Sequence, residues 1–142
     1  MPGDARLSME REQPQRFDLL ALDAFTSDAI PVHLLTREAF EVYQRHVNPH
    51  GVIAVHISNH YLDLEPVVTS IARHFHYQVA TIDYDEFETD WWLYSSTWML
   101  LTRDEAFLDA PAIHWAATPP RTNAMAVPLW TDDFTTLFPI LK

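Results

Sequence analysis

Two aspartates follow a short, mostly apolar run near the start of the chain. The run covers residues 17–22 and ends at Asp23, and a second acid, Asp28, follows before Pro31. A run of about four to eight apolar residues is typical of a strand buried on both faces, as in a parallel sheet. Ligands of open α/β sheets bind beyond the carboxyl ends of the strands, where a carboxylate can accept a proton. We therefore interpret Asp23 and Asp28 as candidate site residues.

A simpler interpretation of Asp23 stays open. Aspartate is common in turns because its side chain hydrogen-bonds to the nearby backbone, so Asp23 could serve only to cap the turn. Two acids and a proline in one strand-end loop favour the site interpretation.

The eight histidines give a second pattern. His56 and His60 are four residues apart, but they fall in a predicted strand and the loop after it, so they share no helix face. His74 and His76 straddle a predicted helix end. No third ligand follows at a metal-site spacing, and the chain has no cysteine. The sequence therefore predicts hydrogen-bonded or solvated histidines and no metal.

The composition predicts one soluble domain covering residues 1–142. Hydrophobic residues make up 48%, enough for a folded core. There are 20 acidic side chains against 9 basic ones, a net charge of −11, which disfavours nucleic acid and attracts cationic small molecules. The sequence has no cysteine and no signal-peptide pattern. It also has no apolar run near the ~18 residues of a membrane span. We therefore expect a cytoplasmic location.

Short apolar runs predict an α/β fold with four strands, at residues 17–23, 51–58, 77–82 and 97–102. The loop joining the last two strands is acidic and leaves no room for a helix. We therefore expect these two strands to pair antiparallel and the remaining strands to run parallel.

Helical spacing predicts two longer helices between these strands. Thr36 is a suitable N-cap for the first, which Pro49 and Gly51 would close. Asp63 would cap the second, whose buried stripe would be Val67, Ile71 and Phe75.

The two ends of the chain give weaker patterns. A short helix is expected near the N-terminus, with Asp4 at its start. The tail from Asp104 is spaced by prolines and predicted to be mostly irregular. Residues 130–141 predict a terminal helical turn that Thr131 would cap.

Glycine is nearly absent, with only Gly3 and Gly51 in the chain. Folds that bind dinucleotides or S-adenosyl compounds normally carry a glycine-rich turn after their first strand, which lets the backbone approach the ligand. Either this chain is no such fold, or the half with that turn is missing from it.

Several segments resemble the C-terminal half of spermidine synthase-like proteins, especially the bacterial branch often fused to a transporter-like membrane segment. They are GDARLSMEREQPQRFDLLALDAF, SDAIPVHLLTREAFEVYQRHV, GVIAVHISN and PLWTDDFTTLF, of which DAFTSDAIPVH is the most specific. The resemblance implies a partial Rossmann-like sheet of the class I S-adenosylmethionine-dependent methyltransferase type, with the N-terminal, donor-binding half absent. A membrane segment is expected only in a longer parent protein.

The resemblance also implies roles for three acids. Asp4 resembles the acid that recognises the adenine of the donor, decarboxylated S-adenosylmethionine. Asp23 matches the aspartate that positions and deprotonates the attacking amine, and Asp28 resembles the aspartate that holds the amine substrate. Asp28 departs from the family pattern, because it lies five residues after Asp23 where the usual gap is three.

The implied reaction transfers an aminopropyl group from the sulfonium donor to a polyamine. The amine must be neutral to attack, so a carboxylate would act as base, and a second one would hold the distal ammonium. Without the glycine-rich loop we expect no tightly bound cofactor and no activity of this chain alone. A methyltransferase-like enzyme and a non-catalytic assembly module stay open as alternatives.

The missing half has a consequence for assembly. The first predicted strand would lack a neighbour on one side, which leaves an apolar edge able to pair with another chain. We therefore expect a homo-oligomer.

Overall fold

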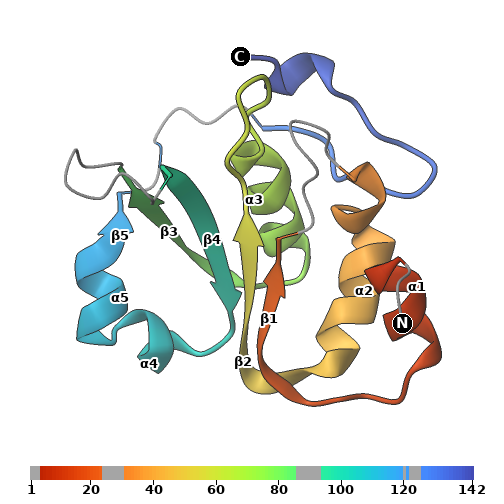
Figure 1. Ribbon diagram of the computed structural model, residues 1–142, viewed down its shortest axis with the longest axis horizontal. Coiled ribbons are helices and arrows are strands. Elements are labelled where there is room, and N and C mark those ends of the chain that lie inside the picture. The colour runs from red at the N-terminus through yellow and green to blue at the C-terminus, as the bar shows by residue number, and fades with distance from the viewer. Residues whose placement is uncertain (1–3, 24–30, 86–93, 120, 122–125) are drawn as a thin grey trace.

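The computed structural model describes residues 4–23, 31–85, 94–119, 121 and 126–142. A five-stranded sheet with the order β1-β2-β4-β3-β5 forms its centre (Figure 1). The strands are β1 (Phe17–Leu22), β2 (Val47–His56), β3 (Gln78–Tyr84), β4 (Ser96–Thr102) and β5 (Ala117–Thr118).

The fold is α/β, as predicted, but the expectation of a mostly parallel sheet holds only in part. Strands β1, β2 and β3 run in the same direction and β4 runs opposite, yet most neighbouring strands pair antiparallel. Only β1 and β2 pair in parallel, while the β2–β4, β3–β4 and β3–β5 pairs are antiparallel. The antiparallel pairing of the third and fourth strands is confirmed. Because β4 turns back beside β3 and also pairs with β2, it separates two strands that run in the same direction. A short connection reverses the chain and so favours an antiparallel neighbour.

The first strand differs from its prediction in burial. Strand β1 is largely exposed rather than buried on both faces, with Leu19 59% and Phe17 38% exposed. Only Leu20 and Leu22 pack against the core. The reason is its position: in the described part of the chain β1 pairs with β2 alone and forms an edge of the sheet.

The core lies between one face of the sheet and two helices, α2 (Arg37–His46) and α3 (Glu65–His74). Thr36 caps α2 by accepting a hydrogen bond from the Ala39 amide, which confirms the predicted cap. The predicted stripe of α3 is confirmed too, since Val67, Ile71 and Phe75 are all buried. Asp63, however, is not the N-cap of α3. That residue is Leu64, although the Asp63 carboxylate accepts a hydrogen bond from the Glu65 amide.

The predicted boundary between α2 and β2 is wrong. The strand begins at Val47, directly after the helix, so Pro49 and Gly51 lie inside β2 instead of closing α2. This longer strand can form because Val47 already pairs with Phe17 of β1 across an irregularity in the register. A helix and a strand thus meet with no loop between them.

The N-terminal prediction is confirmed, because Asp4 is the N-cap of α1 (Ala5–Arg11). A 3₁₀ turn, η1 (Val32–Leu34), precedes α2. The tail is more regular than expected, since α4 (Glu105–Leu108) and α5 (Pro111–Ala116) lead into β5.

The predicted helical turn over residues 130–141 is wrong. Thr131 forms an isolated bridge with Phe134, and only η2 (Phe138–Ile140) is helical. Trp130, at the start of this segment, is fully buried in the core. Among the described helices, none has the length and apolar character needed to cross a membrane.

Candidate functional site

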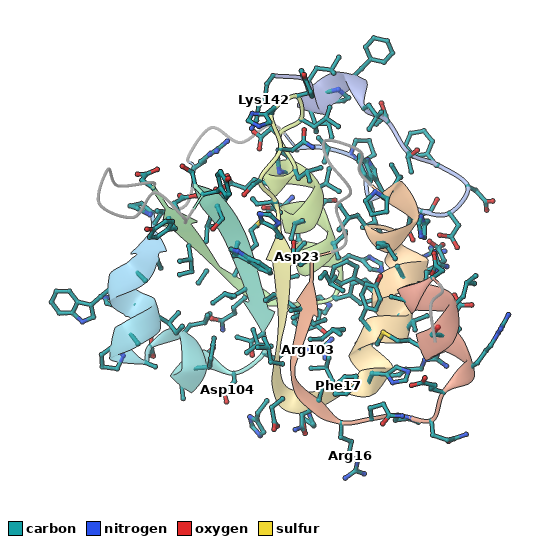
Figure 2. The ribbon with its side chains drawn as sticks, in the orientation of Figure 1. Arg16, Phe17, Asp23, Arg103, Asp104 and Lys142 are labelled. Carbon is teal, nitrogen blue, oxygen red and sulfur yellow. The ribbon has the colours of Figure 1, made fainter. Side chains whose placement is uncertain are left out.

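Three strands have their carboxyl ends at the same end of the sheet, and polar residues lie close together there. Strands β1, β2 and β3 run in the same direction, so their carboxyl ends meet the amino end of β4. Figure 2 places Asp23 at this end of β1, opposite Phe17. We define the strand-end cluster as Asp23, His56, Ser58, Asp83 and Thr97.

His56, the last residue of β2, is the centre of the strand-end cluster. Its Nδ1 lies 2.8 Å from Asp23 Oδ1, and its Nε2 lies 2.8 Å from Ser58 Oγ. The Asp23 carboxylate can only accept, so Nδ1 carries the proton that is shared with Asp23. In the neutral ring Nε2 then accepts the hydroxyl proton of Ser58. The cluster therefore fixes one tautomer of the imidazole.

The imidazole is also held from the side by an aromatic ring. Trp98 of β4 is the cross-strand partner of His56. The two rings stack with their centroids 4.9 Å apart and their planes at 19°. Stacking of this kind restricts the rotation of the imidazole without using its nitrogen atoms.

The hydrogen bonds continue across the remaining strands. The Thr97 amide donates to Ser58 Oγ at 2.7 Å, and the Thr97 hydroxyl donates to Asp83 Oδ1 at 2.7 Å. The strand-end cluster thus links the ends of β1, β2, β4 and β3 in one network. Networks of this kind hold each side chain in a defined orientation.

A cavity of about 740 Å³ opens at this end of the sheet, beside the carboxyl ends of the strands. Ser58, Thr97 and Asp83 of the strand-end cluster line it, together with Asp85 and Lys142. Its volume lies in the range of about 300–1,000 Å³ that small-molecule sites occupy. At the β1 end of the network, the Asp23 side chain is 59% exposed, whereas the His56 side chain is 21% exposed. The Asp23 carboxylate is therefore open to a ligand, while its histidine partner is shielded.

Asp4, the predicted donor-binding acid, lies elsewhere. It accepts a hydrogen bond from the Leu7 amide at 3.0 Å and forms an ion pair with His33 Nε2 at 2.7 Å. The bond from Leu7, followed by that from His33, lowers the pKa of Asp4 below its usual value. Among the described residues, Asp4 forms no contact with any member of the strand-end cluster. The structure thus assigns Asp4 to capping α1 and does not bring it to Asp23.

Asp4 lines a separate cavity of about 720 Å³, in which Arg6 is the main cation. The Arg6 guanidinium donates to both carboxylate oxygens of Asp132, at 2.7 and 2.6 Å. These bonds lower the pKa of Asp132 to about 2 and raise the pKa of Arg6. The contacts join the first helix to the C-terminal segment, so this second group of charges has a structural role.

Asp28, the third predicted site residue, lies outside the described residues, and its role stays a prediction. The sequence patterns do not predict His56 as the partner of Asp23. They also do not predict that Ser58, Thr97 and Asp83 belong to the same network. The sequence does contain a signal for the pairing of His56 with Ser58. The two residues are two positions apart, so in an extended chain their side chains point to the same face. The partnership with Thr97 and Asp83 depends on which strands neighbour each other, which no local pattern reveals.

No group of three or more histidine, aspartate or glutamate side chains in the described ranges is arranged to hold a metal ion. Comparison with known proteins adds no assignment, since no protein-family model matches the chain and no curated protein shows significant similarity to it.

Proposed function

We propose that this chain is the amine-binding half of a spermidine synthase-like aminopropyltransferase, with Asp23 as the residue that orients and deprotonates the amine. The observation that carries the proposal is the Asp23–His56 pair, an exposed carboxylate held by a shielded imidazole at the carboxyl end of a strand. Ligands of open α/β sheets bind at such ends.

The directions of the strands support this proposal. Strands β1, β2 and β3 run the same way and the last long strand, β4, runs opposite, which suits half of a Rossmann-like sheet. The finer assignment to the class I methyltransferase fold is part of the proposal.

The chemistry follows from the contacts of Asp23. His56 occupies Oδ1, so we assign Oδ2 to the nitrogen of the incoming amine. A protonated amine has no lone pair, and a carboxylate within hydrogen-bond reach removes this obstacle by accepting the proton. His56 keeps the carboxylate in position through its Nδ1 proton. The net charge of −11 attracts polycations to the molecule as a whole.

Putrescine binding tests the proposal. We expect wild-type protein to bind putrescine, and Asp23→Asn to weaken this binding at least tenfold, or about 1.4 kcal/mol, because a charge-assisted hydrogen bond is lost. Calorimetric titration at low salt measures both dissociation constants.

Asp109→Asn is the matched control, because Asp109 is an exposed acid at the end of α4 and its replacement changes the net charge by the same amount. If Asp23→Asn and Asp109→Asn bind putrescine equally tightly, the attraction is only that of the overall charge and the proposal fails.

Donor binding gives a second prediction. This sequence contains no glycine-rich turn, and Asp4 is engaged in capping α1. We therefore expect this chain to bind methylthioadenosine, a product of the proposed reaction, more weakly than about 1 mM, or −4 kcal/mol. A dissociation constant in the low micromolar range, measured by the same titration, would show that the chain holds a complete donor site.

A further inference from the structure

The strand-end cluster contains an arrangement that amine binding does not use. Ser58 Oγ, His56 and Asp23 follow one another in a line of hydrogen bonds, each 2.8 Å long. We infer that Ser58 is a nucleophile activated by His56, and that the site accepts acyl groups from small esters that carry no negative charge. This inference goes beyond the proposed function, which requires no hydroxyl.

The order of the three side chains is the order that serine nucleophiles require. A serine hydroxyl is a weak nucleophile unless a neighbouring base takes its proton, and the base must be oriented by a third group. Here His56 Nε2 is the base for Ser58, and Asp23 holds the proton on Nδ1. Both distances lie within the range of about 2.6–3.2 Å expected for such contacts.

Two further contacts favour the reactive state of Ser58. The stacked Trp98 ring keeps the imidazole in line between its two partners. The Thr97 amide donates to Ser58 Oγ at 2.7 Å, which orients the hydroxyl so that its proton points to His56. The hydroxyl is therefore held between a fixed backbone donor and the imidazole that accepts its proton.

The cavity defines the class of substrate. Ser58 is half-buried and lines the cavity of about 740 Å³, so an ester of modest size can reach its Oγ. Asp83 and Asp85 line the same space, and their carboxylates repel esters of acidic molecules. A short acyl ester that carries no negative charge is the substrate that fits both properties.

The reaction has two balanced steps. Ser58 Oγ forms a bond to the acyl carbon while its proton moves to His56 Nε2, and the ester bond breaks as the leaving alcohol takes that proton. Water then attacks the acyl carbon and gives a proton to His56. The bond from the acyl carbon to Ser58 Oγ breaks, the serine recovers the proton, and a carboxylic acid is released.

Covalent labelling tests whether Ser58 is a nucleophile. We expect diisopropyl fluorophosphate to modify the wild-type protein at Ser58, as located by peptide mass mapping, and the wild type to hydrolyse 4-nitrophenyl acetate at least ten times faster than Ser58→Ala. Ser95→Ala is the matched control, because Ser95 lines the same cavity outside the line of hydrogen bonds to His56 and Asp23. Equal labelling and equal hydrolysis in Ser58→Ala would overturn the inference.

A second variant keeps the test valid if Ser58→Ala fails to fold. The natural chain has no cysteine, so Ser58→Cys carries a single thiol. We expect iodoacetamide to alkylate this thiol at neutral pH at least ten times faster than in the double variant Ser58→Cys/His56→Gln, because the imidazole favours the thiolate. Equal rates would show that His56 does not activate position 58.

The same proteins separate this inference from the proposed function. Putrescine binding by the wild-type protein and its loss in Asp23→Asn test the proposed function, whereas labelling and hydrolysis that depend on Ser58 test this inference. Hydrolysis that is lost in Ser58→Ala, in a protein whose wild type binds putrescine, supports both. Hydrolysis that depends on Ser58 in a protein without amine binding would support the nucleophile and contradict the proposed amine site.

Discussion

At Gly51 the backbones of β1 and β2 come so close that a side chain has no room. A Cβ atom there would lie 2.5 Å from Val47 Cγ1 and 2.8 Å from the carbonyl oxygen of Phe17. The second of these atoms belongs to the backbone, so it cannot rotate away as a side chain could. This position in the middle of a strand therefore requires glycine because of space.

The first prediction at the residue scale concerns Gly51→Ala. We expect this change to lower the free energy of unfolding by about 2 kcal/mol, since overpacking forces backbone shifts that cost about 1–3 kcal/mol. Urea unfolding measures the difference. His50→Ala, an exposed change in the same strand, should cost less than about 0.5 kcal/mol and serves as the control. A Gly51→Ala protein as stable as the control would mean that the two strands are farther apart.

At the scale of elements, Arg6 ties three segments together. From α1 its guanidinium donates to the carbonyl of His33 in η1 at 2.9 Å and to both carboxylate oxygens of Asp132 in the C-terminal segment. Asp132 also accepts a hydrogen bond from the hydroxyl of Thr36, the N-cap of α2. The first helix therefore depends on a residue near the end of the chain for its position against α2.

The hydrogen bonds between Arg6 and Asp132 predict a free energy of unfolding that depends on pH. The pKa of Asp132 is lowered from 3.8 to about 2 by Arg6, so its contribution is complete above pH 3.8 and is lost as the pH falls through 2. Since the Asp132 side chain is 40% exposed, we expect Asp132→Asn to cost only about 1 kcal/mol at pH 7. Urea unfolding at pH 7 and pH 2 should show this difference disappearing.

Asp133→Asn provides the control for this measurement, because it removes the same charge from the neighbouring exposed residue. It should leave the stability nearly unchanged at both pH values. A cost of Asp132→Asn that stays the same at pH 2 would indicate that the aspartate acts by packing and not by its charge.

At the scale of the whole molecule, the outer edge of β1 is the main feature. In the described part of the chain this strand pairs only with β2 (Figure 1). The side chains of Phe17 and Leu19 on this strand are exposed. An exposed strand edge offers unpaired N–H and C=O groups that can pair with a second chain. The homo-oligomer expected from the sequence stays a prediction, and this edge is its proposed interface.

Sedimentation tests the role of this edge. We expect wild-type protein to associate with rising concentration, and Leu19→Lys to stay monomeric, because a lysine on an edge strand opposes pairing. Leu137→Lys adds the same charge to another exposed leucine and should associate like the wild type. A wild type that stays monomeric at high concentration, or equal dissociation of both lysine variants, would exclude β1 as the interface.

The sequence determined the features that depend on near neighbours in the chain. The cap at Thr36 and the buried stripe of α3 follow from residues a few positions apart. The antiparallel pairing of β3 and β4 follows from the small number of residues between them. The same holds for Asp23, whose place at a strand end follows from the apolar run before it. Local spacing fixes such features because helices and strands have their own fixed periods.

Tertiary structure decided the features that join distant segments. It placed β4 between β2 and β3, and it brought His56 to Asp23 over 33 positions and Arg6 to Asp132 over 126 positions. It also decided that Trp130 is buried and that helical structure in its segment is confined to η2. These outcomes depend on which surfaces bury the most apolar area together, and this is a property of the whole chain that no single stretch of the sequence contains.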